Sequence, residues 1–115
     1  MQLELTTDDN LDGGDRLSER VAAHVDAALD RFRDRLTRVE VHLGDESARR
    51  SIDTDIRCTV EARPARLKPV AATHHAANVD DACRGALKKL AKALDSQLGR
   101  LDDRKGGASI RRPED

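Results

Sequence analysis

The stretch Asn78–Arg104, NVDDACRGALKKLAKALDSQLGRLDDR, has the pattern of one long amphipathic helix. Its apolar residues recur at intervals of three and four, which places them on one stripe of a helix. They are Val79, Cys83, Ala86, Leu87, Leu90, Leu94, Leu98 and Leu101. Most of the basic residues lie away from this stripe. The helix therefore has one apolar face to bury, and the upstream chain is expected to supply the surface that buries it.

Four upstream segments alternate between apolar and polar residues with the period of a half-buried strand. They are Met1–Thr7, Thr37–Gly44, Ile52–Ala62 and Val70–His75. Pro64 and Pro69 flank a basic hairpin tip between the last two, where their missing N–H groups suit strand ends or an edge. Asn78, with Asp81 three residues later, is predicted to cap the long helix.

A second amphipathic helix is predicted between the first two strands. Gly13–Gly14 supplies a turn, Asp15 or Ser18 is the expected N-cap, and the helix is expected to continue to about Leu36. Its apolar stripe comprises Leu17, Val21, Val25, Ala28, Leu29, Phe32 and Leu36. The opposite face is charged and is interpreted as a solvated surface.

This order of elements predicts an α+β fold, a two-layer β-α-β-β-β-α sandwich. Two helices cover the apolar face of a four-stranded sheet, and the strands on either side of the first helix are parallel. Residues 1–105 are expected to form one domain, because no linker or repeat divides them. Residues 106–115 have the composition of a disordered tail.

The composition argues against an enzyme or a membrane protein. The 115 residues are 37% charged, lack a secretory signal pattern and contain no apolar run long enough to span a bilayer, so we expect a cytoplasmic protein. Nucleotide-binding and nucleophile motifs are missing, and no cofactor or small-molecule substrate is expected. Cys58 and Cys83 fall at inward-facing positions, which favours two buried reduced thiols.

Metal binding is not expected from the histidines. His74 and His75 are adjacent in a strand and therefore face opposite sides, so they are badly placed to chelate one ion together. One of the two is expected on the outer face of the sheet, toward His42. Ordinary solvated histidines are the favoured interpretation.

Charge and aromatic content limit how the chain can bind nucleic acid. Residues 1–36 carry a net charge of −4, whereas residues 37–77 carry +1 and residues 78–105 carry +2. The one aromatic residue, Phe32, lies on an apolar stripe, so bases have no stacking platform. Binding to RNA would therefore use phosphates, sugars and shape.

Three segments resemble the short ribosome hibernation promoting factors and ribosome-associated inhibitors, a family also labelled sigma-factor modulation. They are MQLELTT at the start, DRFRDRLTRVEVHLGDE at residues 30–46 and ALKKLAKALDSQL at residues 86–98. The resemblance covers roughly residues 1–105. It implies a fold similar to a double-stranded-RNA-binding domain and binding in the small ribosomal subunit near the decoding region. Such proteins silence ribosomes under stress by occupancy.

The resemblance also suggests which residues contact ribosomal RNA. Lys89, Lys92 and Arg100 fall on the family's basic positions in the last helix, whereas residues 95–98 replace the middle of its basic run. Further basic candidates lie one turn earlier in the helix, in the hairpin and in the strand before it. These are Arg84, Lys88, Arg63, Arg66, Lys68 and Arg57.

Two functions remain open from the sequence. One is a monomeric hibernation factor whose partner is the small ribosomal subunit. The other is a divergent member of the same fold that acts as a protein-interaction or regulatory module without tight ribosome binding. The hibernation factor is the favoured interpretation, and the arguments for the alternative are the acidic first third, the net charge of −1 and the diluted basic run of the last helix.

Overall fold

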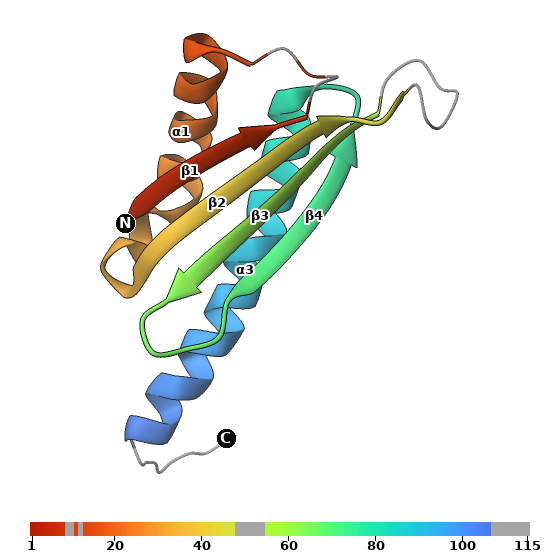
Figure 1. The fold of residues 1–115 in the computed structure, drawn as a ribbon. Coiled ribbons are helices and arrows are strands. Elements are labelled where there is room, and N and C mark those ends of the chain that lie inside the picture. The colour runs from red at the N-terminus through yellow and green to blue at the C-terminus, as the bar shows by residue number, and fades with distance from the viewer. Residues whose placement is uncertain (9–10, 12, 48–54, 107–115) are drawn as a thin grey trace.

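The chain forms a four-stranded sheet with two helices on one face (Figure 1). The computed structural model describes residues 1–8, 11, 13–47 and 55–106, with side chains up to residue 100. The elements are β1 (Gln2–Thr7), α1 (Asp15–Leu29), the 3-10 helix η1 (Asp30–Arg35), β2 (Leu36–Asp45), β3 (Ile56–Pro64), β4 (Val70–Ala76) and α3 (Val79–Gly106). This order confirms the predicted β-α-β-β-β-α sandwich.

The strands lie in the order β1-β2-β3-β4, so sequence order and spatial order agree. β1 and β2 are parallel, as expected for strands joined through a helix, and the other two pairs are antiparallel. Leu5 pairs with Val41, and Val41 pairs with Val60, so inward-facing residues form continuous rows across the sheet. The register thus gives the sheet one apolar face.

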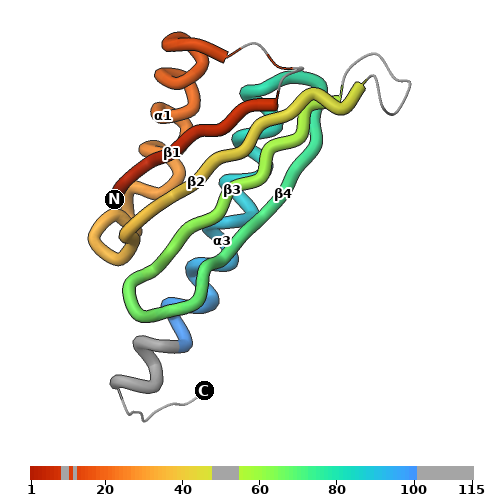
Figure 2. The backbone as a smooth tube through the Cα atoms, viewed as in Figure 1, coloured from red at the N-terminus to blue at the C-terminus, as the bar shows by residue number. Residues whose placement is uncertain are grey.

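The core lies between that face and the two helices. Figure 2 shows α1 behind β1 and α3 behind β3 and β4. The largest fully buried side chains come from α1, β2, β3 and α3. They are Val21, Val25, Leu29, Val39, Val41, Leu43, Cys58, Val60, Cys83, Leu87, Leu90 and Leu94. The predicted apolar stripe of α3 is buried from Cys83 to Leu98 and partly buried at Val79, whereas the side chain of Leu101 lies outside the described part. Both cysteines are buried free thiols, as predicted.

The start of α3 is capped as the sequence predicts. The Asn78 side-chain Oδ1 accepts a hydrogen bond of 2.8 Å from the backbone N–H of Asp81, and the Asn78 amide donates to the Asp81 carboxylate at 3.1 Å. This satisfies one of the N–H groups that a helix leaves unpaired at its first turn. The following 28 residues form the longest element of the chain.

The first helix differs from the prediction at both ends. Gly14, with a φ of 130°, occupies the N-cap position, and no side chain caps the helix, so neither Asp15 nor Ser18 does so. The α-helix stops at Leu29 instead of about Leu36, and the tighter η1 follows. A 3-10 helix repeats every three residues, so Phe32, three residues after Leu29, stays on the buried side.

The strand boundaries agree with the prediction apart from β3. Pro64 ends β3 and Pro69 immediately precedes β4, as the prolines indicated. β3 begins at Ile56, whereas the predicted strand began at Ile52, and residues 52–54 lie outside the described part. The predicted tail also lies outside it, except for Gly106 at the end of α3.

Candidate nucleic-acid interface

The exposed side of α3 is the most basic surface that an element of the described structure presents. Between Val79 and Arg100, the exposed basic side chains outnumber the exposed acidic ones five to two. The basic residues are Arg84, Lys88, Lys89, Lys92 and Arg100, and the acidic ones are Asp81 and Asp95. All five predicted residues of this helix are therefore accessible to a partner.

Both exposed acidic residues are engaged by arginines. Asp81 Oδ1 lies 2.8 Å from Nη1 of Arg84, one turn later on the same helix. Asp95 Oδ2 accepts a hydrogen bond of 2.9 Å from Nη2 of Arg31 in η1. That hydrogen bond lowers the pKa of the Asp95 carboxyl, because it favours the charged form. The acidic residue in the middle of the basic run is thus neutralised from a neighbouring element.

The basic side chains do not form one line along α3. Lys89 points to the β4 side, where its Nζ donates a hydrogen bond of 3.0 Å to the carbonyl oxygen of Thr73. Arg84 and Lys88 lie on the α1 side and line a shallow groove of about 280 Å³ with His24, Ala27, Ala28 and Leu87. Lys92 follows Lys88 by one turn. The arrangement spreads positive charge over the width of the exposed helix.

The β3–β4 hairpin lies near the second half of α3. Because α3 runs back along β4, its second half returns to the end of the sheet that carries the hairpin (Figure 1). Arg66 and Lys68 are exposed on this hairpin, and Arg66 adopts a left-handed φ of 67° at the turn. Leu67 packs against the core and anchors the loop. The structure therefore brings the hairpin residues to the same end as Lys92 and Arg100.

The outer face of the sheet is balanced in charge. Arg38 contacts both Glu4 and Glu40, the latter at 2.9 Å. Arg63 lies 3.5 Å from Glu61 and 3.9 Å from Glu40. Alternating charges of this kind cancel over short distances, so this face does not extend the positive surface of α3. Arg63 belongs to it.

Arg57 is separated from the other predicted residues. Its Nη1 lies 2.5 Å from Oε2 of Glu46, and its Nη2 lies 3.4 Å from Oδ2 of Asp8. It sits on the outer face, at the end of β3 opposite to Arg63. The structure therefore places Arg57 among carboxylates and away from α3.

Sequence reasoning missed the role of Arg31. This residue is 64 positions from Asp95, and its guanidinium also lies 4.3 Å from the centre of the Phe32 ring. No local spacing links positions so far apart, so only the packing of η1 against α3 reveals the pair. His24 and Arg20 of α1 bind Asp80 in the same way, at 2.8 and 2.9 Å.

The histidines also differ from the expectation. His74 and His75 do face opposite sides of β4, but the described contacts of His75 are with Asp55 and Glu46, whereas His42 lies 3.5 Å from Glu40.

Within the described part of the chain, no helix has the length and apolarity that crossing a membrane requires.

Solved structures share this fold. The Thermus thermophilus Protein Y N-terminal domain matches with a TM-score of 0.66 and 20% identity, over 88% of this chain and 99% of that domain. A ribosomal subunit interface protein from Coxiella burnetii matches with a TM-score of 0.55 and 14% identity, over 89% and 98% of the two chains. At these identities the likeness shows the fold alone. No curated protein matches the sequence.

The sequence itself shows the family. Residues 5–105 match the profile described as Sigma 54 modulation protein / S30EA ribosomal protein. The chain therefore belongs to this family of ribosome-associated hibernation factors, which are not enzymes. This confirms the resemblance that the opening strand, the Phe32–Val41 junction and the last helix indicated.

Proposed function

We propose that this protein binds the small ribosomal subunit near the decoding region and inhibits translation by occupying the path of mRNA and tRNA. Family membership supports ribosome association. The printed name of the Coxiella relative, a ribosomal subunit interface protein, supports a ribosomal partner. We further propose that it acts in the cytoplasm as a monomer.

The observation that carries the proposal is the exposed side of α3. Five basic side chains are accessible there, and both exposed acidic residues are already bound by arginines. Ribosomal RNA presents phosphates at high density, and lysine and arginine are the residues that bind them. The proposed contacts are Arg84, Lys88, Lys89, Lys92 and Arg100, extended by Arg66 and Lys68.

Three predicted contacts are expected to contribute less. Arg57 and Arg63 each lie beside two carboxylates, which compete with a phosphate for the guanidinium. Lys89 donates a hydrogen bond to the Thr73 carbonyl oxygen. To bind a phosphate, it must break this bond or use the other two N–H donors of its ammonium group. Lys88, Lys92 and Arg100 are the strongest candidates.

Recognition is expected to depend on RNA shape and phosphates. Phe32, the one aromatic side chain, is 5% exposed and cannot stack on a base. About five phosphate contacts predict that the logarithm of the binding constant falls with the logarithm of salt concentration at a slope of roughly −3.5 to −4.5.

Co-sedimentation with purified small subunits in a sucrose gradient tests the proposal. The protein should travel with the subunits at low salt and be released as salt rises. Lys92→Glu should weaken binding, whereas Arg16→Glu makes the same change of charge at an exposed position of α1 and should not. A protein that stays at the top of the gradient at every salt concentration excludes the proposal, as does equal binding by the two variants.

The balanced outer face of the sheet favours a second function. Its paired charges, Arg38 with Glu4 and Arg63 with Glu61, suit a protein partner better than a polyanion. We therefore keep a protein-interaction or regulatory module as the alternative. Loss of ribosome binding in the gradient, together with recovery of a protein partner through this face, would favour it.

A further inference from the structure

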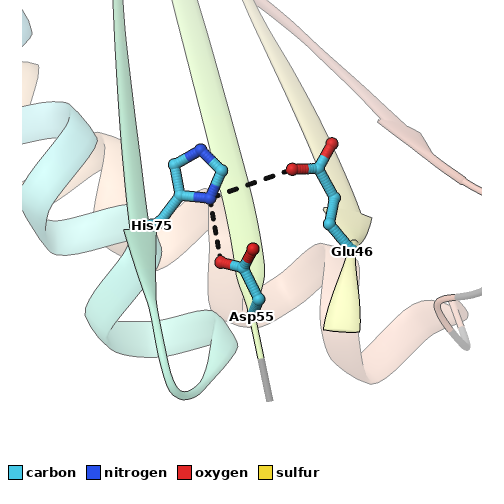
Figure 3. A group of neighbouring side chains, drawn as sticks. All are labelled: Glu46, Asp55 and His75. Atoms are coloured by element: carbon cyan, nitrogen blue, oxygen red, sulfur yellow. Dashed lines mark hydrogen bonds and ion pairs between the residues drawn. The ribbon is translucent and has the colours of Figure 1, made fainter. Parts of the chain in front are cut away.

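Three side chains that suit a metal ion meet on the outer face of the sheet (Figure 3). They are Glu46, Asp55 and His75, and one potential ligand atom of each lies within 4.8 Å of the other two. Glu46 directly follows β2, Asp55 directly precedes β3, and His75 belongs to β4. The donors thus come from β4 and from the residues that flank β2 and β3, at one end of the sheet.

The backbone fixes these positions. The N–H of Glu46 donates a hydrogen bond of 2.8 Å to the carbonyl oxygen of Asp55, which continues the pairing of β2 and β3 beyond the strand ends. His75 is the register partner of Arg57, two residues after Asp55. The backbone of the three residues is therefore held in place by hydrogen bonds between neighbouring segments, as a preformed site requires.

The burial and the donor atoms of this cluster suit a divalent cation. Asp55 is 5% exposed, the one buried charged residue in the described part of the chain, and the Glu46 side chain is 11% exposed. Two carboxylates and an imidazole supply oxygen and nitrogen donors, the ligand types that a divalent transition-metal ion accepts.

The distances approach those between ligands of one ion. His75 Nδ1 lies 2.9 Å from Asp55 Oδ1 and 3.9 Å from Glu46 Oε1. An ion with bonds of about 2.0–2.2 Å holds adjacent ligands roughly 3–3.5 Å apart, so a small shift of Glu46 completes the set. Arg57 binds Oε2 of Glu46 and so orients this carboxylate, whose Oε1 is the atom nearer to His75 Nδ1.

We propose that Glu46 Oε1, Asp55 Oδ1 and His75 Nδ1 bind one divalent transition-metal ion of the Zn²⁺ class. The ion takes the place of the hydrogen bond between His75 and Asp55, and water fills the remaining positions. An imidazole ligand favours Zn²⁺ over Mg²⁺, which prefers oxygen ligands alone. Sequence spacing hides the site because the three residues lie far apart along the chain.

Isothermal titration calorimetry on the reduced, chelator-treated protein tests this site, with ZnCl₂ as the probe and MgCl₂ for comparison. We expect one Zn²⁺ per chain and much weaker binding of Mg²⁺. His75→Gln should lower the Zn²⁺ affinity by about tenfold or more, because it removes the imidazole ligand. His42→Gln is the matched control, since His42 is also beside a glutamate on the outer face.

Glu46→Gln provides a second variant if His75→Gln fails to fold, which circular dichroism would show. It keeps the size of the side chain and should also lower the affinity. Absence of 1:1 binding by the unaltered protein, or equal loss of affinity in the His42 and His75 variants, would overturn the proposal. Neither result bears on ribosome binding, which is tested separately.

Discussion

Arg31 of η1 donates hydrogen bonds from both terminal nitrogens of its guanidinium to the carboxylate of Asp95 in α3, and Nη2 lies 2.9 Å from Oδ2. This bidentate contact joins the segment that leads into β2 to the second half of the long helix. It also neutralises the one acidic side chain that lies between Lys92 and Arg100 in the sequence. The charge of the basic surface therefore depends on a residue outside α3.

Replacing either partner should change binding to small subunits in opposite directions. Arg31→Gln leaves the Asp95 charge uncompensated and should weaken binding by about two- to threefold at low salt, whereas Asp95→Asn should strengthen it by a similar factor. Stability should change little in both variants, because the pair is exposed. Gradient co-sedimentation at two salt concentrations measures this. Identical binding by both variants would mean that Asp95 lies outside the interface.

Gly85 is required by the close approach of α3 to β4. A Cβ built at this position lies 2.1 Å from Cδ2 and 2.4 Å from Cγ of His74, so the whole ring would have to move. Gly85→Ala should therefore destabilise the protein by about 1–3 kcal/mol, despite the better helix propensity of alanine. Urea unfolding followed by circular dichroism measures the change in the free energy of unfolding.

Two variants separate this clash from a general effect of glycine. Gly99→Ala, on the same helix, meets nothing within 4 Å and should stabilise by up to about 1 kcal/mol. His74→Ala combined with Gly85→Ala should lose less stability than the two single effects summed, because the clash is gone. If the double variant loses as much stability as the two single variants together, the His74 ring does not contact position 85.

Asp80 is expected to make stability depend on pH in acid. Hydrogen bonds from His24 and Arg20 lower the pKa of this carboxyl below its ordinary value of 3.8. A lowered native pKa stabilises the fold above the pKa of the unfolded chain, and this contribution is lost as pH falls through the native value. Its size should stay below about 1 kcal/mol, because the side chain is 35% exposed.

Unfolding free energies at pH 7 and pH 3 test this dependence. Asp80→Asn should be less stable than the unaltered protein at pH 7, and the difference should shrink toward pH 3. Arg20→Gln removes one of the two partners and should give an intermediate slope. A difference that stays constant between the two pH values would show that Asp80 does not titrate differently in the folded state.

Local patterns predicted most of the fold. Alternation identified the strands, the stripe of α3 identified its buried face, and Asn78 marked its start, because each depends on residues close in sequence. The end of α1 was wrong because Leu29, Phe32 and Leu36 fit a continuous α-helix as well as an α-helix followed by η1. Contacts between distant residues, such as Arg31 with Asp95, leave no local periodicity.

For the candidate interface too, the sequence predicted the exposed positions but not the charges that surround them. The helix residues followed from periodicity, since Lys88 and Lys92 must lie opposite the apolar stripe. The environment of Arg57 did not follow, because Asp8 and Glu46 come from two other segments. Alternation placed Arg57 on the outer face but carried no information on which charges surround it there.

Cys58 and Cys83 should be unreactive thiols in the folded protein. Cys58 of β3 and Cys83 of α3 lie with their sulfur atoms 3.7 Å apart, and both are at most 1% exposed. The hydrogen bond to Cys83 and burial raise the pKa of the Cys58 thiol, which makes its thiolate scarce, whereas Cys83 is protected by its burial. Reaction with Ellman's reagent at neutral pH should be at least about a hundredfold slower in buffer than in urea, where both thiols become accessible. Cys83→Ala leaves Cys58 as the single thiol and should show the same protection, provided that the variant remains folded. Rapid labelling of the folded protein would mean that α3 separates from β3 frequently, and it would contradict this prediction.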